Sequence, residues 1–158
     1  MSEIVESIKV ELLKRCEAYK EKHGYDFWND HIKYVVKNSI ELAKKYGADV
    51  EIVELGALLH DIAMPSEFGP REEHNVYGVQ IAEELLTQLN YPEDRKERVK
   101  ECVLRHRGSK SLPRNTIEEG TEFVKKKLER DFNKLSDRTK IELKDRYENI
   151  MRVLFVDK

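Results

Sequence analysis

The sequence has little net charge, no long hydrophobic run and no secretory signal. Its 29 Lys and Arg residues against 31 Asp and Glu residues leave a formal charge of −2, so we expect no stable binding to nucleic acid and no attraction to anionic lipid. The longest apolar stretch, residues 55–59, is far shorter than a membrane span. Residues 1–6 alternate acidic and apolar side chains, unlike a secretory signal. These absences predict a cytoplasmic protein without a membrane anchor.

Cysteine is also scarce. Cys16 and Cys102 form no Cys-x-x-Cys pair, and each lies among helically spaced apolar residues. We expect reduced cysteines in the core, with a disulfide as the open alternative. The length of 158 residues and the hydrophobic fraction of 39% suit one compact domain rather than a disordered chain.

Strand-like alternation is missing, and the chain has no internal repeat or linker. Apolar residues instead recur at three and four positions, which predicts an all-α fold. Gly24 and Gly47 are expected to end helices, and Asp30 and Asp49 to begin them. The predicted helices span about residues 4–23, 31–46, 50–63, 74–89, 93–107, 121–135 and 137–156.

The predicted helix at residues 50–63 is apolar on most faces, so it should lie in the middle of the domain. His60 and Asp61 are its polar exceptions near the end. Burying an imidazole and a carboxylate without partners costs roughly several kcal/mol, and a metal ion satisfies both groups. The alternative is structural: His60 caps the helix end and Asp61 begins the next turn.

Three further histidines fall at helix ends. His31 lies in the first turn of its predicted helix, His74 opens another, and His106 lies in the last turn of a third. Antiparallel packing would bring these ends to one pole of a helical bundle, beside His60 and Asp61. Imidazole and carboxylate are suitable ligands for Zn, Fe, Mn, Co or Ni. The set therefore favours a metal site over a group of core histidines.

This arrangement resembles the HD-domain metal-dependent phosphohydrolases. The resemblance covers about residues 28–120, and its most specific stretch is residues 47–62, which end in Leu-Leu-His-Asp-Ile. It implies an all-α bundle in which His31, His60 and Asp61 hold a divalent metal. By the same resemblance, His74 and His106 face the metal, where they either contact substrate phosphate or serve a second ion.

The resemblance also sets an expectation for the domain. We expect one HD-like helical domain over residues 1–158, with its core at about residues 28–120 and C-terminal helices at 121–156 packed on that core. The last helix could instead pack on a second copy, which would make a homodimer.

One departure concerns the family's remaining metal ligand, an Asp that follows soon after the histidine matched by His106. Here the chain passes from Gly120 through Thr121 without an Asp until Asp131, whose surroundings do not match. Either the chain lacks this ligand and keeps a three-ligand site, or a segment near Gly120 is missing from the sequence.

Positive charge gathers around His106. Residues 104–117 contain no acidic residue, and the cations there include Arg107 and Lys110. Together with Arg71, they would suit a phosphorylated substrate, because cations neutralise phosphate oxygens. The alternative is a solvated helix end, where cations are favourable in any case.

The resulting prediction is a divalent-metal-dependent phosphohydrolase that acts on a phosphate ester or phosphoanhydride, with a nucleotide as one candidate substrate. Asp61 would bind metal and accept a proton from the attacking water or orient it, while His74 and His106 would donate to phosphate or to the leaving group. The alternative is a non-catalytic metal- or nucleotide-binding module that lacks the last Asp ligand.

Overall fold

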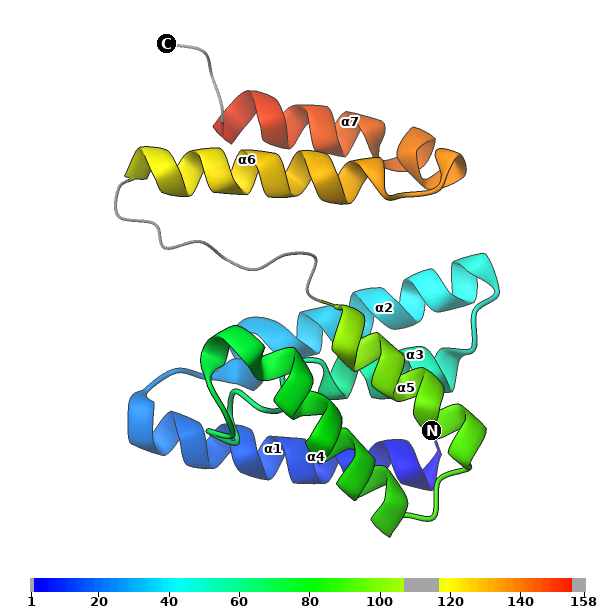
Figure 1. Ribbon diagram of the computed structural model, residues 1–158. Helices are drawn as coiled ribbons and strands as arrows, with labels where there is room; N and C mark the ends of the chain where they lie inside the picture. Colours follow the sequence, from blue (N-terminus) through cyan, green and yellow to red (C-terminus); the bar gives the residue numbers. More distant parts are fainter. Residues whose placement is uncertain (1, 107–116, 155–158) are drawn as a thin grey trace. The chain divides into compact units, whose positions relative to one another are not determined.

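The computed structural model describes residues 2–106 and 117–154, and the side chains of residues 2–106 and 124–152. All regular secondary structure in these ranges is helical, so the predicted all-α fold is confirmed. The chain divides into two compact units, Met1–Ser109 and Lys110–Lys158 (Figure 1). That the C-terminal helices pack on the core stays a prediction. Within the described ranges, no helix combines the length and the apolar character needed to cross a membrane.

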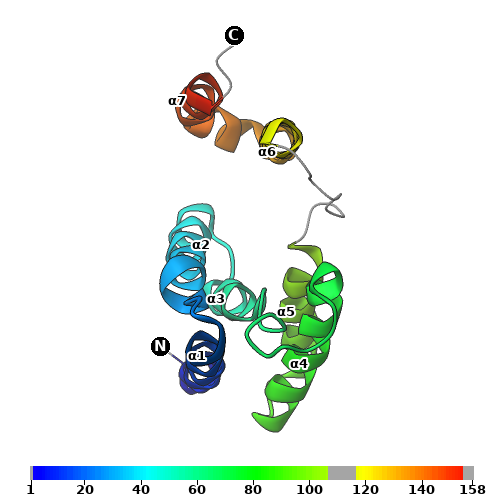
Figure 2. The same cartoon turned by 90° about the vertical axis from the view of Figure 1, so that its left-hand side faces the viewer.

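Five α-helices build the N-terminal unit, and a π-helical and a 3-10 turn precede two of them. In chain order the elements are α1 (Glu3–His23), η1 (Trp28–Ile32), α2 (Lys33–Tyr46), α3 (Val50–Leu59), η2 (Arg71–Glu73), α4 (His74–Gln88) and α5 (Glu93–Arg105). Helix α3 lies between α1 and α2 on one side and α4 and α5 on the other (Figure 2). Six of its ten residues are buried, which confirms the predicted central position.

Three of the predicted helix ends are confirmed. Gly24 and Gly47 end α1 and α2 in the left-handed conformation, with φ of 78° and 70°. The Asp49 carboxylate accepts a hydrogen bond from the Ile52 backbone N–H at 3.2 Å and so caps α3.

The prediction that Asp30 begins the second helix is wrong. Asp30 lies inside the π-helical turn η1. The carboxylate that accepts hydrogen bonds here belongs to Asp26, which receives the backbone N–H and the side-chain amide of Asn29, each at 2.9 Å. These hydrogen bonds hold the pKa of Asp26 at about 2. The π turn therefore begins at Trp28, two residues before the expected cap.

Helix α3 is shorter than predicted. It ends at Leu59, and residues 60–67 continue as a series of turns instead of helix to Ala63. Backbone hydrogen bonds from Ile62 N–H to the Leu59 carbonyl (3.1 Å) and from Met64 N–H to the Asp61 carbonyl (2.9 Å) tighten these turns. Ile62 and Ala63 are nevertheless buried, so the apolar pattern continues past the end of the helix.

Helices α3 and α5 approach closely at Gly56. A Cβ atom added at Gly56 would lie 2.7 Å from the Cβ of Cys102. This is tighter than ordinary van der Waals contact, so glycine is required for the observed spacing.

Both cysteines are free: Cys16 is buried, as predicted, whereas Cys102 is exposed, which corrects its placement in the core.

A charged cluster joins α4 to α5. The buried Lys96 lies with its ammonium 2.7 Å from a carboxylate oxygen of Glu83, and Lys100 lies 2.5 Å from the other oxygen. Hydrogen bonds from Lys100 and Lys96 hold the pKa of Glu83 at about 2. The carboxylate is therefore ionised, and the cluster links the two helices that carry His74 and His106.

The C-terminal unit is a pair of helices, α6 (Ile117–Asn133) and α7 (Asp137–Leu154). Helix α6 thus begins earlier than the predicted residue 121. The rings of Phe132 and Tyr147 stack with centroids 4.1 Å apart. The Ser136 hydroxyl accepts the Thr139 backbone N–H at 3.3 Å and so caps the start of α7. None of the described side chains of this unit is buried.

Candidate metal centre

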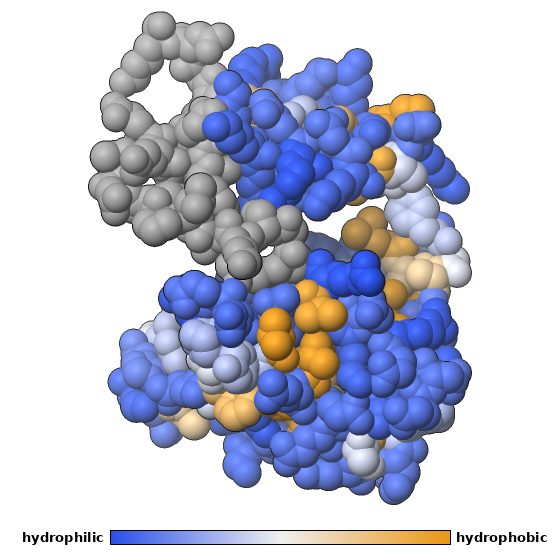
Figure 3. Space-filling model, in the orientation of Figure 1, coloured by the Kyte–Doolittle hydropathy of each residue, from blue (hydrophilic) through white to orange (hydrophobic). Residues whose placement is uncertain are grey.

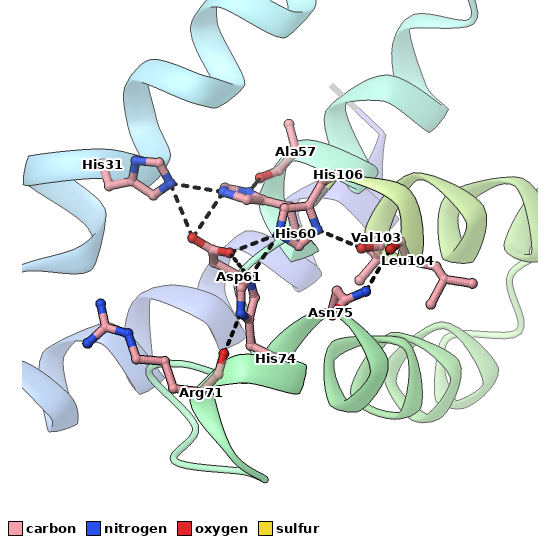
Figure 4. Close-up of polar contacts among 10 residues, drawn as sticks. All are labelled: His31, Ala57, His60, Asp61, Arg71, His74, Asn75, Val103, Leu104 and His106. Carbon is pink, nitrogen blue, oxygen red and sulfur yellow. Dashed lines mark hydrogen bonds and ion pairs between the residues drawn. The ribbon is translucent and has the colours of Figure 1, made fainter. Parts of the chain in front are cut away.

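Four elements of the N-terminal unit meet at one cluster of side chains (Figure 4). His31 comes from η1, His60 and Asp61 follow the last residue of α3, His74 opens α4, and His106 follows α5. The structure therefore brings together all five residues that the sequence placed at one pole of the bundle.

Asp61 lies at the centre and divides the cluster into two halves. Its Oδ2 lies 3.2 Å from His31 Nε2 and 3.3 Å from His60 Nε2, whereas its Oδ1 lies 3.1 Å from His74 Nε2 and 3.3 Å from His106 Nε2. We name His31, His60 and Asp61 half-site A, and Asp61, His74 and His106 half-site B. In each half-site the three ligand atoms lie within 4.8 Å of one another, close enough to hold one metal ion.

Three of the four histidines are held in the same way by the backbone. In each of them Nδ1–H donates to the carbonyl three residues earlier, because a carbonyl oxygen can only accept. The pairs are His60 with Ala57 at 2.8 Å, His74 with Arg71 at 2.7 Å and His106 with Val103 at 2.6 Å. The proton of each neutral ring is thus on Nδ1, and Nε2 presents a lone pair to the cluster. Backbone carbonyls orient metal-binding histidines in this way.

Half-site B consequently contains three acceptor atoms in mutual contact. His74 Nε2 and His106 Nε2 are 3.0 Å apart, and both lie near Asp61 Oδ1. When the rings are neutral, no hydrogen lies between these three atoms, so their lone pairs repel one another. A metal cation or an added proton removes this repulsion.

Half-site A is less constrained. His31 Nε2 is 3.0 Å from His60 Nε2, but the His31 side chain is 41% exposed and its Nδ1 faces away from the cluster (Figure 4). His31 is therefore free to carry its proton on Nε2 and donate it to His60 or Asp61. His60, by contrast, is buried and fixed through Ala57.

Asp61 is ionised, although its side chain is only 17% exposed. Burial acts to raise its pKa, while hydrogen bonds from His106, His31 and His60, which require a proton on Nε2, act to lower it, and the lowering prevails. The pKa of Asp61 therefore lies well below its usual range. Four imidazole nitrogens around one carboxylate suit a borderline transition metal such as Zn, Fe, Mn, Co or Ni.

The model of one protein family, the HD domain, matches residues 29–151. The chain belongs to the HD domain family. The match confirms the resemblance found in the sequence and extends past residue 120 through α6 and most of α7. Members of this superfamily are metal-dependent phosphohydrolases, and HD domains bind divalent metals.

An uncharacterized protein of Clostridium beijerinckii is similar to this HD-domain chain. The two are 32% identical over 104 residues, which cover 63% of this chain and 65% of the relative. The chain thus matches less than two thirds of the length of that relative. No solved structure matches the chain.

Of the three cations predicted to bind phosphate, Arg71 is the one that lies within the described residues. Arg71 contributes its backbone carbonyl to His74, while its exposed side chain extends outward beside the cluster (Figure 4). Arg107 and Lys110 lie outside the described residues. Asp131, the first Asp after Gly120, lies on α6 and pairs with Arg130 at 2.8 Å.

Sequence reasoning missed the atoms that orient the histidines. The carbonyls of Ala57, Arg71 and Val103 have no signature, because every residue carries a carbonyl. It also missed Asn75, whose side-chain amide donates to the Leu104 carbonyl at 2.9 Å and joins α4 to α5. The only signal for Asn75 is its position next to His74.

Proposed function

We propose that this HD domain is a divalent-metal-dependent phosphohydrolase that hydrolyses a phosphate ester or phosphoanhydride. The observation that carries the proposal is the contact of His74 Nε2, His106 Nε2 and the ionised Asp61, three acceptors within 3.3 Å of one another. Membership of the HD domain family supports the reaction class.

His31, His60 and Asp61 would hold one metal ion in half-site A, and Asp61, His74 and His106 a second in half-site B. A bound divalent cation would polarise a phosphoryl oxygen and lower the pKa of water toward neutrality. Because the Nδ1–H groups of His74 and His106 are committed to carbonyls, their Nε2 atoms suit metal binding better than proton donation.

Asp61 has one further role. Each of its two oxygens lies within 3.3 Å of two histidine Nε2 atoms and is committed to a half-site, so we propose that Asp61 orients the attacking water rather than deprotonating it. Glu72 and Glu73 of η2, which precede His74, are the candidates for the general base.

The proposed substrate is a small phosphorylated molecule, with nucleotides as the first class to test. Arg71 has an exposed side chain beside the cluster and would neutralise phosphate charge there. Arg107 and Lys110 follow His106 closely in sequence and are assigned the same role.

A non-catalytic metal- or nucleotide-binding module is the second candidate. It is favoured by one observation, namely that the sequence has no Asp between Gly120 and Asp131, where the family's remaining ligand is expected. Such a protein would bind metal through the same half-sites without turning over substrate.

Elemental analysis and a hydrolysis assay separate these functions. The purified protein is loaded with Mn²⁺, Co²⁺ or Fe²⁺, its metal content is measured, and p-nitrophenyl phosphate and a panel of nucleotides are offered. We expect bound metal and phosphate release, both lost in Asp61→Ala and retained in Gln80→Ala, a matched change at an exposed position of α4. Metal without turnover would favour the binding module. Absence of metal, or undiminished hydrolysis by Asp61→Ala, would refute the proposed mechanism.

A further inference from the structure

The start of α4 and the end of α5 are joined by one side chain. The Asn75 amide donates to the Leu104 carbonyl at 2.9 Å. Leu104 is near the end of α5, where backbone carbonyls lack a partner within the helix. Asn75 follows His74 directly, and Leu104 lies two residues before His106, so this hydrogen bond ties together the two helix ends that carry half-site B (Figure 4).

The geometry of half-site B depends on the distance between these helix ends. The His74 and His106 rings are each fixed by a carbonyl of their own segment, which leaves little freedom within either ring. The two helices also pack closely, since a Cβ added at Gly78 would lie 3.2 Å from Val103 Cγ1. The ion pairs of Glu83 with Lys96 and Lys100 join the two helices nine residues along the chain from His74, so the position of the end of α5 against the start of α4 is left to local contacts.

The surface around this hydrogen bond includes exposed apolar side chains. Val76 and Leu104 are 44% and 38% exposed, and an apolar patch lies on the surface where α4 begins and α5 ends (Figure 3). Besides the contact between His74 and His106 within half-site B itself, the Asn75 amide hydrogen bond joins these two helix ends. Apolar contacts alone would allow sliding, whereas a directed hydrogen bond opposes it.

We propose that Asn75 is a positioning residue that sets the separation of His74 and His106 and thereby the metal affinity of half-site B. The inference rests on the proposed function, which places a metal ion in that half-site. The two histidines of half-site A come from η1 and from the turn after α3, which Asn75 does not join. Loss of the hydrogen bond should therefore weaken half-site B and leave half-site A nearly unchanged.

Two backgrounds isolate the half-sites. His31→Ala leaves half-site B with its three ligands and removes one ligand of half-site A. His106→Ala does the reverse. Asn75→Asp is placed in each background, because it keeps the size of the side chain and removes the amide donor. Asn75→Ala is the second variant, and Gln80→Ala, on the exposed face of α4, is the control. Binding is measured by Co²⁺ titration followed in visible absorption, together with the melting temperature of the metal-free protein.

We expect Asn75→Asp and Asn75→Ala to weaken Co²⁺ binding about tenfold or more in the His31→Ala background, the usual effect of removing a partner that orients metal ligands. In the His106→Ala background, and with Gln80→Ala in either, the affinity should change less than about twofold. Unchanged affinity at half-site B, or equal weakening at both half-sites, would overturn the role of Asn75 while leaving the proposed function intact. If the unmodified protein binds no Co²⁺, the proposed function itself fails.

Discussion

Gly56→Ala tests whether the close spacing of α3 and α5 depends on the absence of a Cβ atom at residue 56. The added methyl group would lie 2.7 Å from the Cys102 Cβ, and ordinary contact begins at 3.4 Å, so the two helices must separate by the difference, 0.7 Å. The obstructing atom is a Cβ and cannot rotate away. Overpacking of this kind costs about 1–3 kcal/mol, whereas replacing glycine by alanine in a helix gains about 1 kcal/mol. The net expectation is a loss of up to about 2 kcal/mol.

Gly78→Ala is the matched control, because it adds a methyl group to α4 facing the same partner helix. Its nearest obstruction, 3.2 Å away, is the Val103 Cγ1 methyl, which needs to yield by only a few tenths of an ångström. Helix propensity should then nearly balance the crowding, so Gly78→Ala should be the more stable variant. Urea unfolding followed by circular dichroism gives both free energies.

A second substitution, at Cys102, tests whether its Cβ is the atom that obstructs the added methyl group. Cys102→Gly removes the obstructing Cβ. Its effect on the free energy of unfolding should therefore be more favourable by about 1 kcal/mol in the Gly56→Ala protein than in the unmodified protein. A coupling of this size is typical of residues in contact. If Gly56→Ala stabilises the protein as helix propensity alone predicts, or if the double mutant shows no coupling, the close approach does not control the spacing of α3 and α5.

Two further predictions concern charge and metal. The pKa of Glu83 is lowered from 4.5 to about 2 by Lys100 and Lys96, so its ionised form stabilises the fold above pH 4.5, and this contribution is lost as the pH falls toward 2. Glu83→Gln should therefore unfold more easily than the unmodified protein at neutral pH, by about 1 kcal/mol after solvent screening, and the two pH–stability curves should converge in acid; parallel curves would contradict this. Co²⁺ at about 100 times its dissociation constant should add about 2.7 kcal/mol to the free energy of unfolding, measured by urea titration. In the His106→Ala background, which leaves only half-site A complete, His60→Ala should remove that gain, and an equal gain there would contradict binding at half-site A.

Helix ends with a local signal could be predicted from the sequence. Gly24 and Gly47 adopt the left-handed conformation that glycine favours, and Asp49 caps α3 with its own side chain. The prediction for Asp30 was wrong because this residue lies inside a π turn. A π turn differs from an ordinary helix start in its backbone hydrogen bonds, which the pattern of residue types does not reveal. The end of α3 was misplaced because Ile62, though in a turn, is as buried as a helix residue.

The candidate site, too, could be predicted only in part from the sequence. That His31, His60, His74 and His106 should meet followed from their places at helix ends and from the antiparallel packing of neighbouring helices. How Asp61 distributes its two oxygens between the half-sites could not be predicted, because it depends on the orientation of four rings and on small shifts of α4 and α5. Asn75 was missed for the same reason, since its partner is a carbonyl on another helix.

The backbone carbonyls that hold three of the histidines make the cluster robust to mutation. Ala57, Arg71 and Val103 each act through a main-chain oxygen, so their side chains can be exchanged while the local turn persists. On the proposed function, the side chain of residue 71 could therefore be changed to suit another phosphorylated substrate without disturbing the ligand that its carbonyl orients. Arg71→Ala should accordingly preserve Co²⁺ affinity even where it raises KM. On the proposed function, the Arg71 side chain contacts substrate and its carbonyl orients a metal ligand, so the two roles can change independently within one residue.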